Sequence, residues 1–188
     1  MRKPTLLKAL LPLALIAAAC APPWTVVRQA NPNPFQTQRS FAVEAIRFDT
    51  LQVGGKTEAE YLAGKDPKQL ESWAGDKAEM SNLFASELAA NATGLTIAPP
   101  GPTSAIVRPS CSFVEPGNYN SFVNISTEVR LVLQILDASG QVQDEIETHT
   151  SVPASIFNPA SGGRMRTAAK SLGKNIATYL AVRAGTAK

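Results

Sequence analysis

Four neighbouring residues near the C-terminus, Ser161, Gly162, Gly163 and Arg164, combine groups with which proteins bind a small anion. They precede an amphipathic helical pattern, so backbone N–H groups and a guanidinium would meet at a helix N-terminus. The same four residues also suit a glycine-rich turn with Ser161 as the helix cap. The sequence leaves both interpretations open.

Three further cations, Arg166, Lys170 and Lys174, follow at intervals of four residues and therefore lie along one side of the expected helix. No acidic residue occurs after Glu147. This basic line predicts a contact with anionic lipid head groups or with an acidic partner, and a solvated helix face is the alternative.

Catalytic residues are scarce. His149 is the only histidine, which excludes a zinc site built from histidines. For nucleophilic catalysis it would have to pair with Cys111 or with a serine. The alternating pattern places His149 on the polar side of a strand and Cys111 among apolar neighbours, as a small buried residue. We therefore expect neither an enzyme nor a metal or cofactor site, with a hydrolase as a distant alternative.

The first 19 residues have the composition of an export signal. Arg2, Lys3 and Lys8 supply positive charge, an apolar run follows from Leu10, and three alanines precede Cys20. The apolar run has only about ten residues, whereas a helix needs about 20 to span a bilayer. We therefore expect cleavage and export of the rest of the chain.

A cysteine directly after small residues resembles the lipobox of bacterial lipoproteins. In that family the signal is cut before the cysteine, whose thiol receives diacylglycerol and whose new amine is acylated. The resemblance implies lipidation of Cys20, although Ala17 stands where leucine is usual. Ordinary signal cleavage, which would leave Cys20 unmodified, is the alternative. Ala21 after the cysteine, rather than aspartate, resembles lipoproteins sorted to the outer membrane, facing the periplasm.

The charge balance argues against nucleic acid as a partner. The full chain of 188 residues has 18 Lys and Arg against 15 Asp and Glu. Residues 1–19 contain three of the cations and no acid, so the mature chain has 15 of each sign. A neutral chain lacks the general basic surface that binds nucleic acid.

Three regions follow from these patterns. Residues 1–19 are the signal, residues 20–40 form a tether rich in proline and asparagine, and residues 41–185 form one domain. Within the tether, Trp24, Val26 and Val27 form a short apolar cluster that offers an added strand. The loop over 116–124 carries Tyr119 and Phe122, which indicate a binding surface unless they pack back onto the core.

Two helices are predicted within the domain. The first has Asp66 as its N-cap, Pro67 at its first position and Gln69 in a capping box, and Gly94 lies just past its end. Its apolar stripe contains Leu70, Trp73, Met80, Leu83, Phe84 and Leu88. The second begins after residues 161–163, with a stripe of Met165, Ala168, Ala169, Leu172, Ile176, Tyr179 and Leu180.

The strands predict an antiparallel sheet. Residues 41–48 form one strand. Residues 106–115 form an edge or bulged strand, because Pro109 has no backbone N–H to donate to a neighbouring strand. Residues 125–152 form a hairpin with its turn at 137–140. A regular turn of four residues would place two residues opposite each other when their residue numbers add up to 277. Asp144 falls opposite apolar Leu133 in this register, which allows a bulge near the turn, and we interpret Asp144, Glu145 and Glu147 as a solvated acidic face.

These elements predict an α+β fold with two layers, in which about four antiparallel strands are backed by two helices. The mature chain resembles a family of small uncharacterised bacterial envelope lipoproteins in residues 60–66, 107–109, 114–117, 144–146 and 158–164. The order of elements resembles, more weakly, auxiliary lipoproteins of envelope transport and secretion complexes with an anticodon-binding-like domain. The resemblance implies a non-enzymatic accessory or adaptor that binds an unidentified envelope protein. A periplasmic domain that binds a small ligand or lipid is the alternative.

Overall fold

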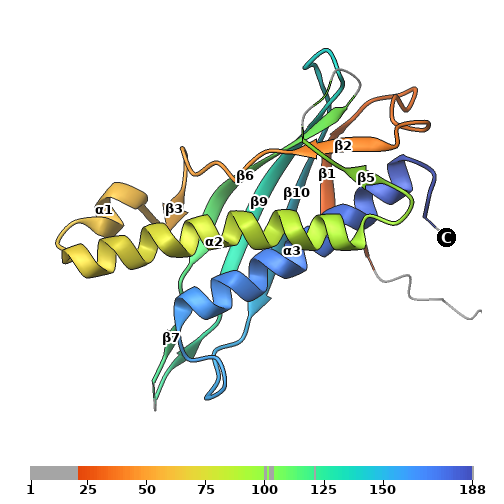
Figure 1. Ribbon diagram of the computed structural model, residues 1–188. Coiled ribbons are helices and arrows are strands. Elements are labelled where there is room, and N and C mark those ends of the chain that lie inside the picture. Colours follow the sequence, from red (N-terminus) through yellow and green to blue (C-terminus); the bar gives the residue numbers. More distant parts are fainter. Residues whose placement is uncertain (1–20, 100, 102–103, 121, 188) are drawn as a thin grey trace, which may run out of the picture.

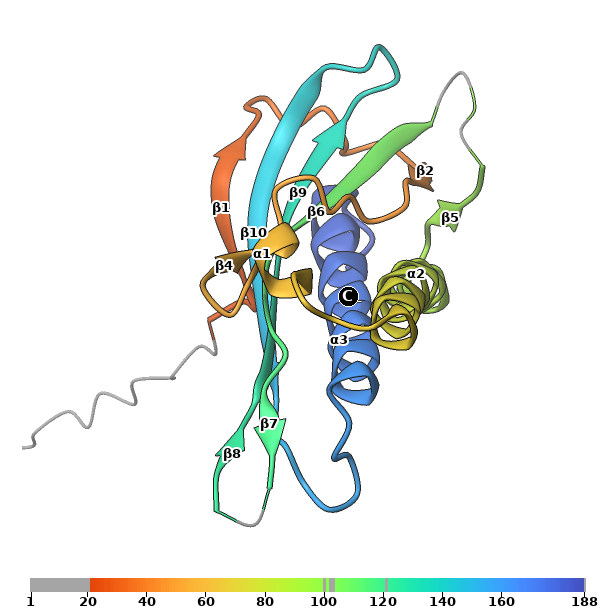
Figure 2. The same ribbon diagram turned by 90° about the vertical axis from the view of Figure 1, so that its left-hand side faces the viewer.

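The computed structural model describes residues 21–187 apart from 100, 102–103 and 121, so the expected signal and Cys20 lie outside the described residues. The described chain forms one α+β domain, as expected. One face of its main sheet carries the two long helices, α2 (Pro67–Asn91) and α3 (Ser161–Arg183) (Figure 1, Figure 2). A short helix, α1 (Glu58–Leu62), precedes α2.

The expectation of about four antiparallel strands in a two-layer, anticodon-binding-like arrangement is wrong. In the described part of the chain the main sheet has eight strands in the order β1-β10-β9-β6-β2-β5, with β3 pairing with both β6 and β4. It is a mixed sheet, because β2 runs parallel to β5 and β6. A separate two-stranded sheet contains β7 and β8. The strands are β1 (Trp24–Gln29), β2 (Ser40–Val43), β3 (Gln52–Val53), β4 (Lys56–Thr57), β5 (Thr96–Ile97), β6 (Ala105–Glu115), β7 (Asn118–Tyr119), β8 (Asn124–Ile125), β9 (Thr127–Leu136) and β10 (Val142–Val152).

The hairpin of β9 and β10 forms, but in a register two residues away from the expected one. Arg130 faces His149 rather than Glu147. The shift has two equal causes. The loop between the strands, residues 137–141, has five residues rather than four, and a bulge between Val142 and Asp144 displaces the return strand by one residue more. Because side chains alternate with a period of two, an even displacement leaves the same side chains facing the helices.

Strand β6 lies in the middle of the sheet, so the expected edge position is wrong, although a bulge is present between Cys111 and Phe113. Pro109 is accommodated because its missing donor points away from β9. Its carbonyl accepts a hydrogen bond from the N–H of Arg47, on the side where β2 has already ended at Val43. A proline there costs the β6–β9 ladder no hydrogen bond.

Helix α2 begins as the sequence predicts. The Asp66 carboxylate accepts a 2.8 Å hydrogen bond from the N–H of Gln69, whose side chain accepts a 3.1 Å bond from the N–H of Asp66. Gly94, past the end of the helix, has a positive φ of 70°. The stripe is buried at Trp73, Met80, Phe84 and Leu88, but Leu70 in the first turn is 40% exposed.

Helix α3 packs against β9, β10 and α2, and every member of its predicted stripe is buried. At Gly173 an added Cβ would come within 2.6 Å of the Phe84 carbonyl oxygen, so the two helix backbones approach closely there. No helix among the described residues is long and apolar enough to cross a bilayer.

The segment expected as a tether contributes to the domain. Trp24, Val26 and neighbouring residues form β1, an added strand that pairs antiparallel with β10 at the edge of the sheet. Trp24 also packs edge-on against the ring of Tyr179 in α3, with 5.6 Å between ring centroids. The folded domain therefore begins well before residue 41.

Candidate functional site

The predicted anion site at Ser161, Gly162, Gly163 and Arg164 is not open to an external anion. Ser161 and the glycines form the first turn of α3, with Ala160 as N-cap and no side-chain cap, so the alternative of a turn capped by Ser161 is also wrong. Gly162 lies against the carboxylate of Asp76 from α2, so closely that an added Cβ would overlap it. The protein thus places its own carboxylate beside this helix N-terminus, where negative charge is favourable.

Arg164 is buried, and its guanidinium contacts only uncharged groups among the described residues. It donates to the hydroxyl of Thr127 at 2.7 Å and to the carbonyl oxygens of Pro116 at 3.0 Å, Asn158 at 3.1 Å and Pro159 at 2.5 Å. Burial lowers the pKa of this guanidinium below its ordinary value. Arg164 therefore holds two backbone segments and the Thr127 side chain together rather than presenting a charge at the surface.

The basic line is largely neutralised by α2. Arg166 donates to Asp76 at 2.6 Å, and the Nζ of Lys174 lies 3.8 Å from a carboxylate oxygen of Glu87. Lys170 is exposed and has no acidic partner among the described residues. The sequence showed that no acid follows Glu147 along the chain, but it could not show that acids of α2 pack alongside.

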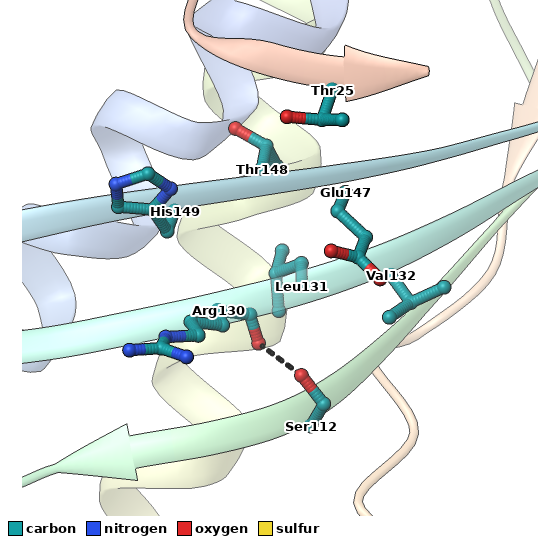
Figure 3. Close-up of a pocket in the computed structure, with 8 residues that line it drawn as sticks. All are labelled: Thr25, Ser112, Arg130, Leu131, Val132, Glu147, Thr148 and His149. Carbon is teal, nitrogen blue, oxygen red and sulfur yellow. Dashed lines mark hydrogen bonds between the residues drawn. The ribbon is translucent and has the colours of Figure 1, made fainter. Parts of the chain in front are cut away.

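A hollow of about 270 Å³ lies on the helix-free face of the sheet (Figure 3). It is lined by Thr25, Ser112, Arg130, Leu131, Val132, Glu147, Thr148 and His149. Ser112 and His149 lie on β6 and β10, with β9 between them. Two strand spacings separate them by about 9–10 Å, too far for the hydrogen bond that activates a serine nucleophile.

Cys111 is fully buried on the opposite, helix-covered face, as predicted. Burial raises the pKa of its thiol to about 12, and the thiol donates a weak 3.7 Å hydrogen bond to the Phe113 carbonyl. The reactive thiolate is therefore scarce near neutral pH. No group of three or more His, Cys, Asp or Glu side chains suited to a metal occurs within the described ranges.

We expect a thiol reagent added to native protein at pH 8 to label Cys111 only at the rate of unfolding. The reason is twofold, since the side chain is inaccessible and a pKa of about 12 keeps it protonated. Labelling should accelerate only as the pH rises toward that value or as denaturant unfolds the chain. Rapid labelling at pH 8 without denaturant would contradict this, and a time course read by mass spectrometry decides it.

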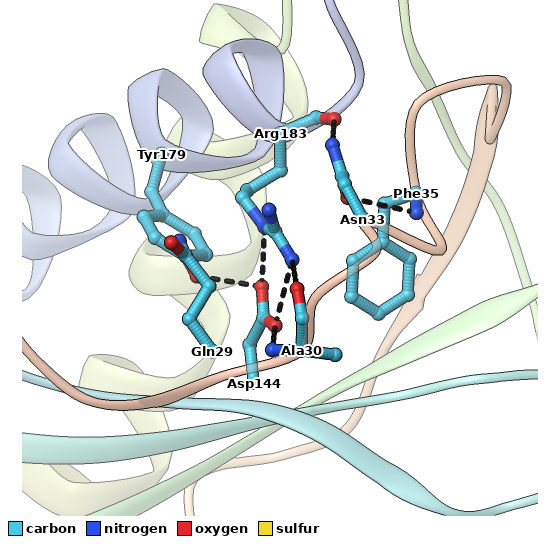
Figure 4. A network of polar contacts seen from close by, with 7 residues as sticks. All are labelled: Gln29, Ala30, Asn33, Phe35, Asp144, Tyr179 and Arg183. Carbon is cyan, nitrogen blue, oxygen red and sulfur yellow. Dashed lines mark hydrogen bonds and ion pairs between the residues drawn. The ribbon is translucent and has the colours of Figure 1, made fainter.

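A buried polar network joins β10, α3 and the segment after β1 (Figure 4). The Asp144 carboxylate accepts hydrogen bonds from Arg183 at 2.6 and 2.9 Å and from the Tyr179 hydroxyl at 2.6 Å. Asp144 is fully buried, so its interpretation as part of a solvated acidic face is wrong. Burial and this carboxylate raise the pKa of Tyr179, which keeps the hydroxyl a donor.

The network fastens the N-terminal segment to the end of α3. The N–H of Ala30 donates to Asp144 at 3.0 Å, and Arg183 donates to the Ala30 carbonyl at 3.1 Å. The side chain of Asn33 donates to the Arg183 carbonyl at 2.7 Å and accepts from the N–H of Phe35 at 3.0 Å. At the other end of β1, the Thr148 hydroxyl donates to the Pro23 carbonyl at 2.7 Å.

The sequence contained one signal for this network. Asp144 shares the alternation of the apolar residues in its strand, so it should face the core, and a carboxylate there needs a partner. Its partner Arg183 is 39 residues away in the last turn of α3, which no local pattern indicates.

Comparison with protein-family models finds no match, and comparison with curated proteins finds none. Among solved structures, PelC dodecamers from Paraburkholderia phytofirmans in two crystal forms, one of them a single-residue variant, are similar at 15% and 14% identity. For both, the TM-score is 0.38, and the matched region covers 81% of this chain and 96% of the PelC chain. Similarity at this level carries no argument about the function of this chain.

Proposed function

We propose that this protein is a lipoprotein anchored to the outer membrane through acyl groups on Cys20, and that it acts as a non-enzymatic accessory of an envelope complex in the periplasm. The observation that supports the proposal is the attachment of β1. Trp24, only four residues after Cys20, is already paired with Thr148 in the sheet. At up to ~3.3 Å per residue, the connection would be at most about 13 Å long.

Such a short connection gives the anchor a mechanical role. A long tether would let the domain explore a large volume, whereas this one would hold it against the bilayer in a restricted orientation. Two or more acyl groups would make the attachment stable, since one chain alone binds only marginally. The Asp144–Arg183 pair secures the segment after β1, so a pull on the anchor would be transmitted to the sheet and to α3.

The accessory role rests on the free edge of β1. This strand ends the sheet in the described part of the chain, and its other edge has no partner strand there. Val26 and Val27 are 45% and 53% exposed along it. An extended segment of another protein could add to this edge through main-chain hydrogen bonds, although the bulge between Val26 and Arg28 limits the length of pairing.

A small-ligand role has less support. Typical ligand sites are lined mostly by apolar and aromatic side chains, which the hollow on the sheet is not. Charged and hydroxyl side chains provide much of its lining. It therefore fits a surface depression of the sheet better than a ligand site.

Crosslinking in intact envelopes tests the accessory role. A photo-crosslinking residue at Val27 should give one discrete adduct with an envelope protein, because the side chain is exposed beside the free strand edge. The same residue at Glu71, exposed on α2, is the matched control and should give none. Equal patterns at both positions would remove the support for β1 as the contact edge.

A further inference from the structure

Large apolar side chains are exposed on two loops at one end of the molecule. Phe122 is 96% and Phe157 91% exposed, each beside a branched aliphatic neighbour, Val123 at 49% and Ile156 at 68%. Phe122 belongs to the loop between β7 and β8, and Phe157 to the loop between β10 and α3. Both loops extend past the N-terminus of α3, and they lie at the same end in both views (Figure 1, Figure 2).

Each apolar pair is held at the tip of an ordered turn. The Asn120 side chain accepts hydrogen bonds from the N–H groups of Phe122 at 2.9 Å and Val123 at 2.7 Å. In the other loop, the N–H of Asn158 donates to the Ser155 carbonyl at 3.1 Å, which closes a turn with Ile156 and Phe157 at its corners. The turns present these side chains outward instead of letting them fold back onto the core.

Arg164 joins the bases of the two loops. It donates to the Pro116 carbonyl, just before β7, and to the Asn158 and Pro159 carbonyls, just after Phe157. Residues 116–126 and 153–163 contain no Lys, Arg, Asp or Glu. The two tips, Phe122–Val123 and Ile156–Phe157, therefore form one uncharged end, below termed the apolar end.

The path of the N-terminal segment leads toward this end. Strand β1 runs antiparallel to β10, so the residues before Trp24 continue toward Val152, where β10 leaves the sheet for the Phe157 loop. Thr148 lies opposite Trp24, and the four residues of β10 from Thr148 to Val152 span about 13 Å. Four residues from Trp24 back to Cys20 reach about as far. A fully extended connection would thus let an acyl group on Cys20 reach the level of Val152, at the base of the Phe157 loop and on the side of the molecule where the apolar end lies.

We propose that the apolar end inserts into the lipid interface beside the acyl chains, so that Phe122 and Phe157 serve as two additional contacts with the bilayer. This rests on the proposed anchoring at Cys20. Bilayer lipid fits the end better than an acidic or basic partner, because the loops have no charge to recognise one. Aromatic and aliphatic tips flanked by Asn and Ser suit the boundary between acyl chains and head groups. Binding then needs no anionic lipid and is insensitive to salt.

Fluorescence quenching by lipid tests the inference on the lipidated protein in phosphatidylcholine vesicles that carry brominated acyl chains. An environment-sensitive probe is attached at Phe122→Cys, at Phe157→Cys and, as the control, at Ser139→Cys in the β9–β10 turn at the opposite end. Cys111 is buried and does not compete for the label. The two tip probes should be quenched and blue-shifted equally at low and high salt, and the Ser139 probe should be unaffected.

The outcomes separate this inference from the proposed function. Acylated protein with unquenched tip probes overturns the inference and leaves the anchor intact. If the tip probes are shielded without lipid quenching and the protein sediments as a dimer, the end is a contact between copies, which also overturns it. If Cys20 carries no acyl chain, the proposed anchoring is wrong. The insertion of the apolar end is then tested by measuring how tightly the unacylated protein binds phosphatidylcholine vesicles. Binding should then weaken about tenfold for each Phe→Ser change at the tips, and equal binding by all variants overturns it.

Discussion

Replacing Asp144 with alanine should lower the free energy of unfolding by ~3–5 kcal/mol, the typical cost of breaking a buried ion pair by removing one partner. The variant leaves the Arg183 guanidinium without its carboxylate and removes the acceptor used by the Ala30 N–H and by Tyr179. The loss should appear as a lower midpoint in denaturant titration followed by circular dichroism. It should also expose the segment around Ala30 to proteases, since that segment loses its attachment.

The matched control is Glu147→Ala, which removes an exposed carboxylate from the same strand. Its effect should stay within about 0.5 kcal/mol. A double variant, Asp144→Leu with Arg183→Met, should recover part of the loss because well-packed apolar residues can replace a buried pair. A loss below ~1 kcal/mol for Asp144→Ala alone would mean that the network contributes little to stability.

Replacing Phe84 with alanine should cost ~3–5 kcal/mol, because the ring is fully buried and the cavity cannot collapse completely. Phe84 lies at a close approach of α2 and α3, opposite Gly173. Leu70→Ala is the control on the same helix, since Leu70 is 40% exposed and should lose much less. A titration in which both variants lose the same amount would contradict the assigned packing of α2.

Local signals predicted the two long helices, but α1 was missed and much of the sheet was not predicted. The capping box of Asp66 and Gln69 and the stripe through Phe84 depend on neighbours three or four residues away, which a sequence displays directly. Strands β3, β4, β5, β7 and β8 have two residues each, too short for alternation to show. The pairing of β2 with β5 and β6 is decided by tertiary packing, so the extent of the sheet could not be predicted.

The candidate site was predicted only in part, for a similar reason. The sequence displayed the charges of Arg164 and Asp144 but not their burial, which depends on groups far along the chain. Arg164 reaches Pro116, 48 residues away, and Asp144 reaches Arg183. The hairpin register shifted by two residues because the loop of residues 137–141 is one residue longer than a regular four-residue turn and the bulge beside Asp144 adds one more.

Acylation of Cys20 is tested most directly by the mass of the protein extracted from membranes. We predict a mature chain that begins at Cys20 and carries diacylglycerol on the thiol and a further acyl group on the amine. The Cys20→Ser variant should carry neither and should leave the membrane fraction once its signal is removed, with its thermal unfolding unchanged because the contacts of β1 begin at Pro23 and Trp24. A mature protein with an unmodified Cys20 would contradict the account.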